Sequence, residues 1–259
     1  MQHWMVANFL KFNAHKTQFL LICSQHLRHK VNIPNIHVGD TLVGDTLVAP
    51  CSYARNLGVL FDNSMNLDRH VMNVCQSAYV HLRRIVAIRE SLTLPTAEQL
   101  IHTFISSRLD FCNSLLAGLP KHTVQRLQKV QNAAACSLTR TKTSHHITPV
   151  LHDLHWLPVN YRIQFKVLLL TFKALHGLAP SYIQDMLQYR HMRPGLRSSS
   201  SSHILSVPKT RLATYGDRAF SSCAPRLWNS LPGELRDEND LSRFKLQLKT
   251  HLFNLAFHL

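Results

Sequence analysis

Carboxylates are scarce in this chain. Its 259 residues include only 14 Asp and Glu against 29 Lys and Arg, which gives a formal net charge of +15. No two aspartates are adjacent, and the only neighbouring acidic pair is Asp237 and Glu238. Two-metal phosphoryl transfer and two-acid glycoside hydrolysis need clustered carboxylates, so the composition argues against both kinds of chemistry. The positive charge favours polyanionic partners instead.

Several site motifs are also absent from the sequence. It has no GxxxxGK[ST] or GxGxxG phosphate-binding loop and no GxSxG nucleophile turn. Its six cysteines form no CxxC or CxC pair, so we predict reduced, mostly buried thiols in an intracellular protein rather than a zinc ribbon. No apolar run approaches the roughly 20 residues of a membrane span. The first 12 residues lack the pattern of a signal peptide, and we expect no membrane partner.

Eighteen histidines raise the question of a metal site. The densest group is His145, His146, His152 and His155, but no HExxH motif and no Cys or Glu at ligand spacing accompanies it. The alternative interpretation is the exposed start of a helix that docks Trp156 into the core, and we predict no metal ligands. A Ser–His–Asp or Cys–His assembly stays open, because such groups meet only in space.

Hydrophobic spacing predicts a mainly α protein with a small α+β part at its N-terminus. In that part we expect a short helix at 3–12, strands at 17–23 and 55–62, and hairpin strands within 36–48, where GDTLV occurs twice in tandem. The helical body follows. Its first four expected helices span 66–89, 95–109, 121–138 and 159–176, and a short helix begins at Pro180. A helical segment at 216–231 is expected to be interrupted near Pro225. The last expected helix spans 242–257, with Asp240 or Ser242 as its N-cap. A Ser-rich loop near 193–206 lies between the helix that begins at Pro180 and the segment at 216–231.

Basic residues concentrate in the second half of the chain. Between Arg140 and Arg226 there are 12 Lys and Arg against three acids, a balance of +9. This pattern predicts contacts with a phosphate backbone, together with stacking of bases or sugars, and an affinity that depends on salt but little on sequence. The alternative is an ordinary solvated basic face. The interleaved aromatic residues are Tyr161, Tyr182, Tyr189 and Trp228.

Several long blocks resemble one known family. HWMVANFLKFNAHKTQFLLI is similar to the late-palm segment of non-LTR (LINE-type) retrotransposon reverse transcriptases, and RNLGVLFD is similar to the primer-grip region that follows it. The blocks HTFISSRLDFCNSLLAGLP, RLQKVQNAAA, HITPVLHDLHWLPVNYRI, LLLTFKALHGLAPSYI, VPKTRLATYGDRAFSSCAPRLWNSLP and FKLQLKTHLF resemble the thumb and C-terminal region of the same family. The resemblance covers essentially the whole chain.

The resemblance implies a division of the chain into a palm remnant (1–65), a helical thumb-like region (66–140) and a helical basic C-terminal region (141–259). It also implies that the parent protein is an RNA-directed DNA polymerase acting in the nucleus. The family's aromatic-Ala-Asp-Asp motif does not occur here, so the two Mg²⁺ ions of polymerisation would have no ligands. We therefore expect a truncated, non-catalytic fragment without a cofactor that still binds RNA, DNA or an RNA–DNA hybrid.

Two sites carry over by resemblance. Lys16 matches the late-palm lysine, which would lie near the phosphates of the incoming nucleotide, although an ordinary loop lysine explains it as well. Leu57, Gly58 and Val59 match the primer-grip turn, and a tight turn between strands is the alternative. The nucleic-acid-binding residues that we predict are Arg83, Arg84, Arg140, Lys142, Arg162, Arg193, Arg197, Lys209 and Arg211.

Two other hypotheses stay open beside this one. The chain could be a decayed element or gene-model fragment without a selected function. It could also be a domesticated protein that uses its helical body as an interaction scaffold.

Overall fold

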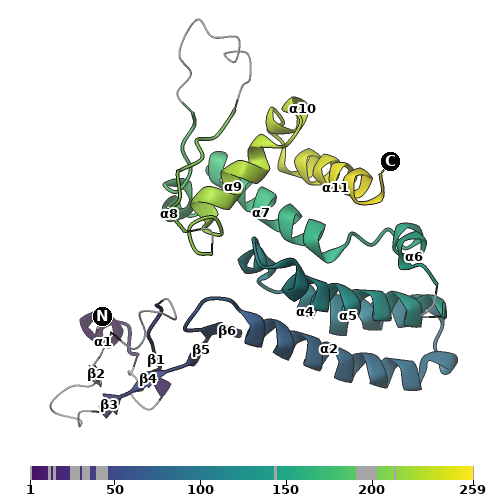
Figure 1. The fold of residues 1–259 in the computed structure, drawn as a ribbon, viewed down its shortest axis with the longest axis horizontal. Coiled ribbons are helices and arrows are strands. Elements are labelled where there is room, and N and C mark those ends of the chain that lie inside the picture. The colour runs from purple at the N-terminus through teal and green to yellow at the C-terminus, as the bar shows by residue number, and fades with distance from the viewer. Residues whose placement is uncertain are drawn as a thin grey trace, which may run out of the picture. The chain divides into compact units, whose positions relative to one another are not determined.

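The computed structural model describes residues 2–10, 13, 16–23, 30, 36–38, 46–142, 145–190, 203–212 and 214–258. The chain forms two compact units, Met1–His70 (unit 1) and Val71–Leu259 (unit 2). Residues 71–140 and 141–259 share unit 2, where α5 packs against α6 and α7. Figure 1 shows the short strands of unit 1 and the helices of unit 2.

Unit 1 is built from short elements. Its strands form separate two-stranded pairs: β1 with β4 in parallel, and β2 with β3 and β5 with β6 antiparallel. The strand expected over 17–23 is reduced to two residues, and the helix expected over 3–12 is shorter than predicted. The elements are α1 (Gln2–Ala7), β1 (Phe19–Leu20), β2 (Ile36–Val38), β3 (Thr46–Val48), β4 (Pro50–Cys51), β5 (Tyr53–Asn56) and β6 (Val59–Asp62).

The strand expected over 55–62 is instead a hairpin. Its two-residue turn consists of Leu57 and Gly58, with φ angles of 46° and 86°. Both residues lie in the left-handed region, as the favoured hairpin turn requires, so the chain reverses and Asn56 pairs with Val59. The prediction of one strand was wrong because an apolar run alone does not reveal such a turn.

The end of β6 is tied to the start of the next helix by Asp62. Its carboxylate accepts hydrogen bonds from the backbone N–H groups of Ser64, Asn66 and Leu67 and from the Ser64 hydroxyl. Burial alone would raise the pKa of Asp62, but these hydrogen bonds outweigh it and lower the pKa. The charged form therefore holds the loop that leads into α2.

Unit 2 is helical among its described residues, and the helices expected at 66–89, 121–138, 159–176 and 242–257 are confirmed. Figure 1 shows α7 lying beside both α9 and α11. The helices are α2 (Asp68–Ala87), which begins in unit 1, η3 (Arg89–Ser91), α3 (Leu94–Ile101), η4 (His102–Ser106), α4 (Ser107–Asp110), η5 (Asn113–Leu116), α5 (Lys121–Thr139), α6 (Ile147–Asp153), α7 (Val159–Leu175), α8 (Ser181–Gln184), α9 (Phe220–Asn229), α10 (Gly233–Arg236) and α11 (Leu241–Phe257).

The core of unit 2 follows the apolar stripes of these helices. Around α7, α9 and α11 the rings of Phe172, Trp228 and Phe244 stack at the centre and are inaccessible to solvent. The second group of buried side chains comes from α2, α3, η4 and α5: Val71, Ala78, Leu82, Ile85, Ala97, Ile101, Ile105, Leu127, Val130 and Ala134. Burial of such side chains is the main contribution to the stability of a helical body.

Two details of the helices differ from expectation. The helix expected from Pro95 to residue 109 contains a π-helical turn, η4, between α3 and α4. The helix expected to break near Pro225 does not break, because α9 runs through the proline and buries Ala224, Pro225 and Trp228 against the core. Packing of this face compensates for the hydrogen bond that proline cannot make.

Two sequence features fall largely outside the described residues. They are the tandem GDTLV repeat, of which 46–48 are described, and the Ser-rich loop, of which 203–206 are described. Among all described helices, none combines the length and the apolar character that crossing a bilayer requires.

Candidate nucleic-acid interface

The helix α2 presents the first predicted arginines to solvent. Its buried stripe includes Ala78, Leu82 and Ile85, so the positions between them, Arg83 and Arg84, face outward. Arg83 lies on the same strip of α2 as Gln76, Tyr79 and Val80. Arg84 lies on a different strip of α2, one turn after His81.

The π-helical turn places an aromatic ring next to His81 of α2. Phe104, in η4, is 38% exposed, whereas Ile105 is buried. The ring of Phe104 stacks on the ring of His81 from α2, with centroids 5.1 Å apart and planes inclined by only 14°. Single π-turns inside α-helices are found frequently at functional sites.

Arg108 completes the group. Its guanidinium donates a hydrogen bond to Nε2 of His81 at 3.0 Å. Because guanidinium only donates, Nε2 must accept, and the proton of the neutral imidazole sits on Nδ1. Partial burial lowers the pKa of His81, and the charges of Arg108 and then Arg84 lower it further. The imidazole is thus held neutral between two permanent cations.

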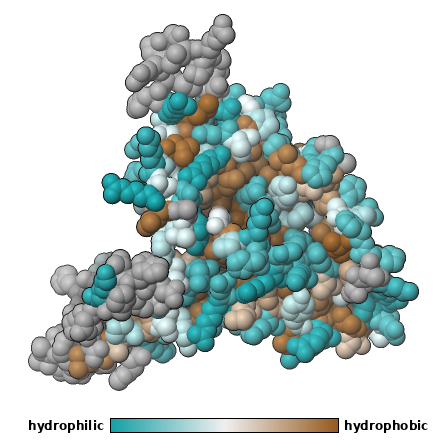
Figure 2. All heavy atoms as spheres, in the orientation of Figure 1, coloured by the Kyte–Doolittle hydropathy of each residue, from teal (hydrophilic) through white to brown (hydrophobic). Residues whose placement is uncertain are grey.

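His81, Arg84, Phe104 and Arg108 are called the His81 cluster below. Within the described part of the chain, neither Arg84 nor Arg108 has a carboxylate partner. The exposed ring of Phe104 offers a stacking surface, and the guanidinium groups of Arg108 and Arg84 near its partner His81 offer donors for phosphate oxygens. The face of unit 2 seen in Figure 2 is otherwise mixed, with hydrophobic groups scattered among hydrophilic side chains.

Three other basic residues that the sequence analysis predicts to bind nucleic acid lie between 140 and 162. Arg140 caps α5 in a left-handed conformation, with a φ of 58°, and its guanidinium donates to the carbonyl of Arg89. Lys142 is exposed two residues later. Arg162 on α7 is half-buried and forms a two-pronged ion pair with Asp110 at the end of α4, so its donors are occupied inside the protein. A role of Arg162 in nucleic-acid binding stays a prediction.

The remaining basic predictions lie after α8. Lys209 and Arg211 are exposed, and Arg193 and Arg197 lie outside the described residues. No hydrogen bond or ring contact among the described residues joins Lys209 or Arg211 to the His81 cluster.

The aromatic residues expected to stack on bases divide into two groups. Tyr182 and Tyr189 are 62% and 49% exposed and accessible to a ligand. Trp228 is completely buried, and its indole N–H donates to the carbonyl of His203 at 2.9 Å. The expectation that Trp228 contacts nucleic acid was therefore wrong, because the apolar face of α9 places it in the core.

The predicted sites of unit 1 lie in separate elements. Lys16 is exposed in a short turn after Asn13. Leu57 and Gly58 form the tip of the β5–β6 hairpin, where Leu57 is 87% exposed, and Val59 is buried at the start of β6. The tight turn between strands is thus present, and a role in primer binding stays a prediction.

The histidine group near Trp156 packs on aromatic rings. The His152 and His155 rings lie 5.4 and 5.7 Å from the ring of Phe253, and Trp156 is buried. The expectation that this segment docks Trp156 into the core is confirmed. In the described ranges, no three His, Cys, Asp or Glu side chains are arranged to hold a metal ion.

Sequence reasoning found only one member of the His81 cluster, Arg84. The spacing of His81 and Arg84 on one helical face was visible, but nothing in the sequence marked the π-turn that brings Phe104 and Arg108 to them.

Neither family models nor curated proteins nor solved structures gave a match to this chain. The resemblance to reverse transcriptases therefore rests on the sequence blocks alone.

Proposed function

We propose that this chain is a nucleic-acid-binding part of a non-LTR reverse transcriptase and binds RNA, DNA or an RNA–DNA hybrid through the phosphate backbone. Unit 1 would correspond to a palm remnant, and α2 to a thumb helix on the template–primer. The observation that carries the proposal is the His81 cluster, since it combines two arginines that have no acidic partner among the described residues with the exposed ring of Phe104, stacked on His81. The net charge of +15 supports it.

The proposal includes no polymerase activity for this chain. Polymerisation uses two metal ions held by paired carboxylates, and Asp237 and Glu238 are the only adjacent acids in the sequence. We accordingly propose no resident cofactor. A nuclear location follows from the family resemblance and belongs to the same proposal.

The test is the salt dependence of binding. Fluorescence anisotropy of a labelled RNA–DNA hybrid with the full chain should give an affinity that falls linearly on a log–log plot as salt rises. The double variant Arg84→Ala/Arg108→Ala should bind more weakly, and the slope should fall by about 2, because each arginine that contacts a phosphate contributes about 1. Absence of binding at about 50 mM salt would overturn the proposal.

A matched control removes the same charge elsewhere. Lys245 and Lys249 are exposed on α11, and Lys245→Ala/Lys249→Ala should leave most of the affinity and slope intact. Equal losses in the two double variants would show that total charge, and not the His81 cluster, determines binding.

A further inference from the structure

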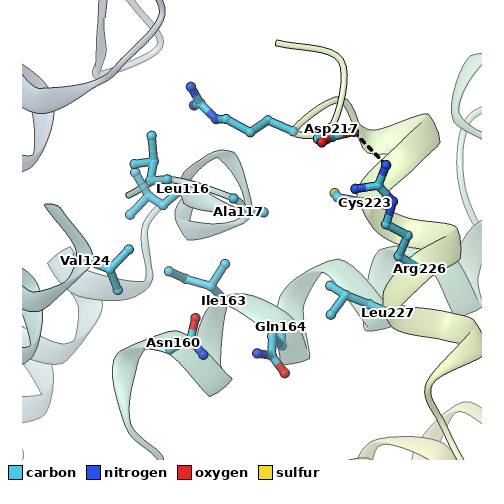
Figure 3. A pocket seen from close by; sticks show the side chains of 13 residues that line it. Leu116, Ala117, Val124, Asn160, Ile163, Gln164, Asp217, Cys223, Arg226 and Leu227 are labelled. Carbon is cyan, nitrogen blue, oxygen red and sulfur yellow. Dashed lines mark hydrogen bonds and ion pairs between the residues drawn. The ribbon is translucent and has the colours of Figure 1, made fainter. Parts of the chain in front are cut away.

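Unit 2 contains an open cavity that lies apart from the His81 cluster residues. It measures about 430 Å³ and is bounded by the turn at 116–119, by α7 and by α9 (Figure 3). We call it the α7–α9 cavity. Its volume falls within the range of small-molecule sites in proteins.

Part of the wall of the α7–α9 cavity is apolar. Leu116 and Ala117 face Leu227 across the space, and Ile163 of α7 projects between them (Figure 3). The turn that supplies the first wall is closely packed, because a Cβ on Gly118, whose φ is 70°, would come within 2.7 Å of the Arg218 side chain. The apolar side chains offer a contact surface for a small ring.

Two amides of α7, one exposed and one half-buried, lie along one side of the cavity. Asn160 and Gln164 are one helical turn apart on α7 and both line the space. Within the described residues, neither side chain makes a hydrogen bond to the protein. Each amide can donate and accept at once, which is the property needed to recognise the edge of a nucleobase.

An ion pair forms the polar wall opposite the turn. The Arg226 guanidinium donates to Asp217 at 2.6 Å, and Asp217 also accepts from the Thr210 hydroxyl. The Arg226 hydrogen bond, followed by that of Thr210, lowers the pKa of Asp217. The carboxylate is therefore charged at neutral pH and balances the charge of Arg226 on this wall, which Arg218 also lines.

Cys223 adds a neutral side chain to the same wall. Burial raises the pKa of its thiol, an effect that Arg226 only partly offsets. The thiol therefore stays protonated at neutral pH and acts as a small apolar contact rather than a nucleophile.

We propose that the α7–α9 cavity binds one unpaired nucleobase of a single-stranded nucleic acid. The base would lie in the open part of the cavity against Ala117, Ile163 and Leu227, with its edge hydrogen-bonded to Asn160 and Gln164. The inference rests on the proposed function, because the strand must first be held by its phosphates. Beyond the proposed function, a nucleobase site would let the protein distinguish exposed bases from bases that are paired in a duplex.

The experiment compares an intact RNA strand of about 12 nucleotides with the same strand carrying abasic residues at its central positions. Abasic residues keep the phosphates and remove only the bases. The full chain should bind the intact strand about tenfold more tightly, as expected for one well-held base. Asn160→Ala/Gln164→Ala should abolish this difference and leave the affinities for the abasic strand and for an RNA–DNA hybrid unchanged.

Two further variants make the result specific. Ala117→Phe fills the cavity from a different element and should abolish the same difference. Gln99→Ala/Asn254→Ala removes two exposed amides from α3 and α11 and should preserve it. Circular dichroism verifies that each variant is folded.

The outcomes separate the two proposals. Equal binding of intact and abasic strands by the unaltered protein, together with normal binding of the hybrid, would overturn the nucleobase site and leave the proposed function standing. Failure to bind either strand or the hybrid at low salt would overturn the proposed function.

Discussion

A buried arginine connects the end of α2 with the end of α5. Arg89 is 8% exposed, and its guanidinium donates to the carbonyls of Leu138, at 2.7 Å, and Leu92, at 3.0 Å. These carbonyls lie where a helix leaves its last acceptors unused. In a chain so poor in acids, this buried cation thus donates to backbone oxygens rather than to a carboxylate, while its Nε has no acceptor among the described residues.

A buried histidine beside the β5–β6 hairpin predicts a pH dependence of stability. Nδ1 of His70 accepts a hydrogen bond from the Leu60 N–H at 3.4 Å, so the ring must be neutral there. Burial, and to a lesser extent the charge of Arg55, lowers the pKa of His70 below 6.5. Between this lowered pKa and 6.5 the unfolded state binds more protons, so stability present above pH 6.5 is lost as the pH falls.

His70→Gln keeps an acceptor for Leu60 but removes the titration. The variant should therefore lose less stability than the unaltered protein between about pH 7 and pH 5, measured as the midpoint of urea unfolding. His122→Gln, at an exposed position on α5, controls for the loss of one imidazole. Identical pH profiles for His70→Gln and the unaltered protein would contradict the assignment.

At the scale of elements, caps and turns decide where helices begin. The sequence left Asp240 and Ser242 as alternative N-caps of the last helix. In the structure Asp240 has extended backbone angles, and its carboxylate accepts a hydrogen bond from the Arg243 N–H at 2.7 Å. Asp240 is therefore the N-cap, and α11 begins at Leu241.

This assignment predicts different effects for two neighbouring substitutions. Asp240→Ala should destabilise the protein by about 1 kcal/mol, because it leaves an N–H of the first turn without its acceptor. Ser242→Ala, on the exposed surface of the same turn, should change stability by less than about 0.5 kcal/mol. Thermal unfolding of both variants tests the prediction, and a larger effect of Ser242→Ala would refute it.

The π-turn η4 is the element with the clearest functional consequence. It lies between two regular helices, α3 and α4, and presents Phe104 to the ring of His81. The residues of α4 after the turn include both Arg108, at the surface, and Asp110, which anchors Arg162 of α7. One local irregularity thus helps to build the candidate interface, while the segment after it attaches to the rest of unit 2.

At the scale of the whole molecule, the two units differ in how much apolar surface they bury. In unit 1 the described hydrophobic residues with fully buried side chains are Val59 and Leu67, and its large exposed hydrophobic residues include Trp4, Phe9 and Leu57. Each described sheet has only two strands, a size that is marginally stable in water. Unit 2 has the layered helical core described above.

Limited proteolysis should reflect this difference. Trypsin should cut unit 1 first, for example after Lys16 or Arg55, while sites between 83 and 173 in unit 2 stay intact. Mass spectrometry of early time points identifies the cuts. First cleavage within 83–173 would contradict the expectation that the helical core of unit 2 is the more stable part.

The sequence by itself determined the helical class and most of the long helices. Apolar residues at 3–4 spacing recur over α2, α5, α7 and α11. Such a period, kept over four or more turns, indicates an amphipathic helix and argues against a strand. It also determined the positive charge and the absence of paired aspartates, because both depend on composition alone.

Only the tertiary structure decided which of the predicted site residues remain available to a ligand. The sequence predicted that Trp228 stacks on bases and that Arg162 binds nucleic acid, but Trp228 is buried in the core and Arg162 forms an ion pair with Asp110. Conversely, His81, Phe104 and Arg108 meet only because α2 packs beside a segment with a π-turn. The physical reason is the same in each case. Periodicity reports which face of a helix is apolar, whereas exposure and pairing depend on neighbours that lie far away in the sequence.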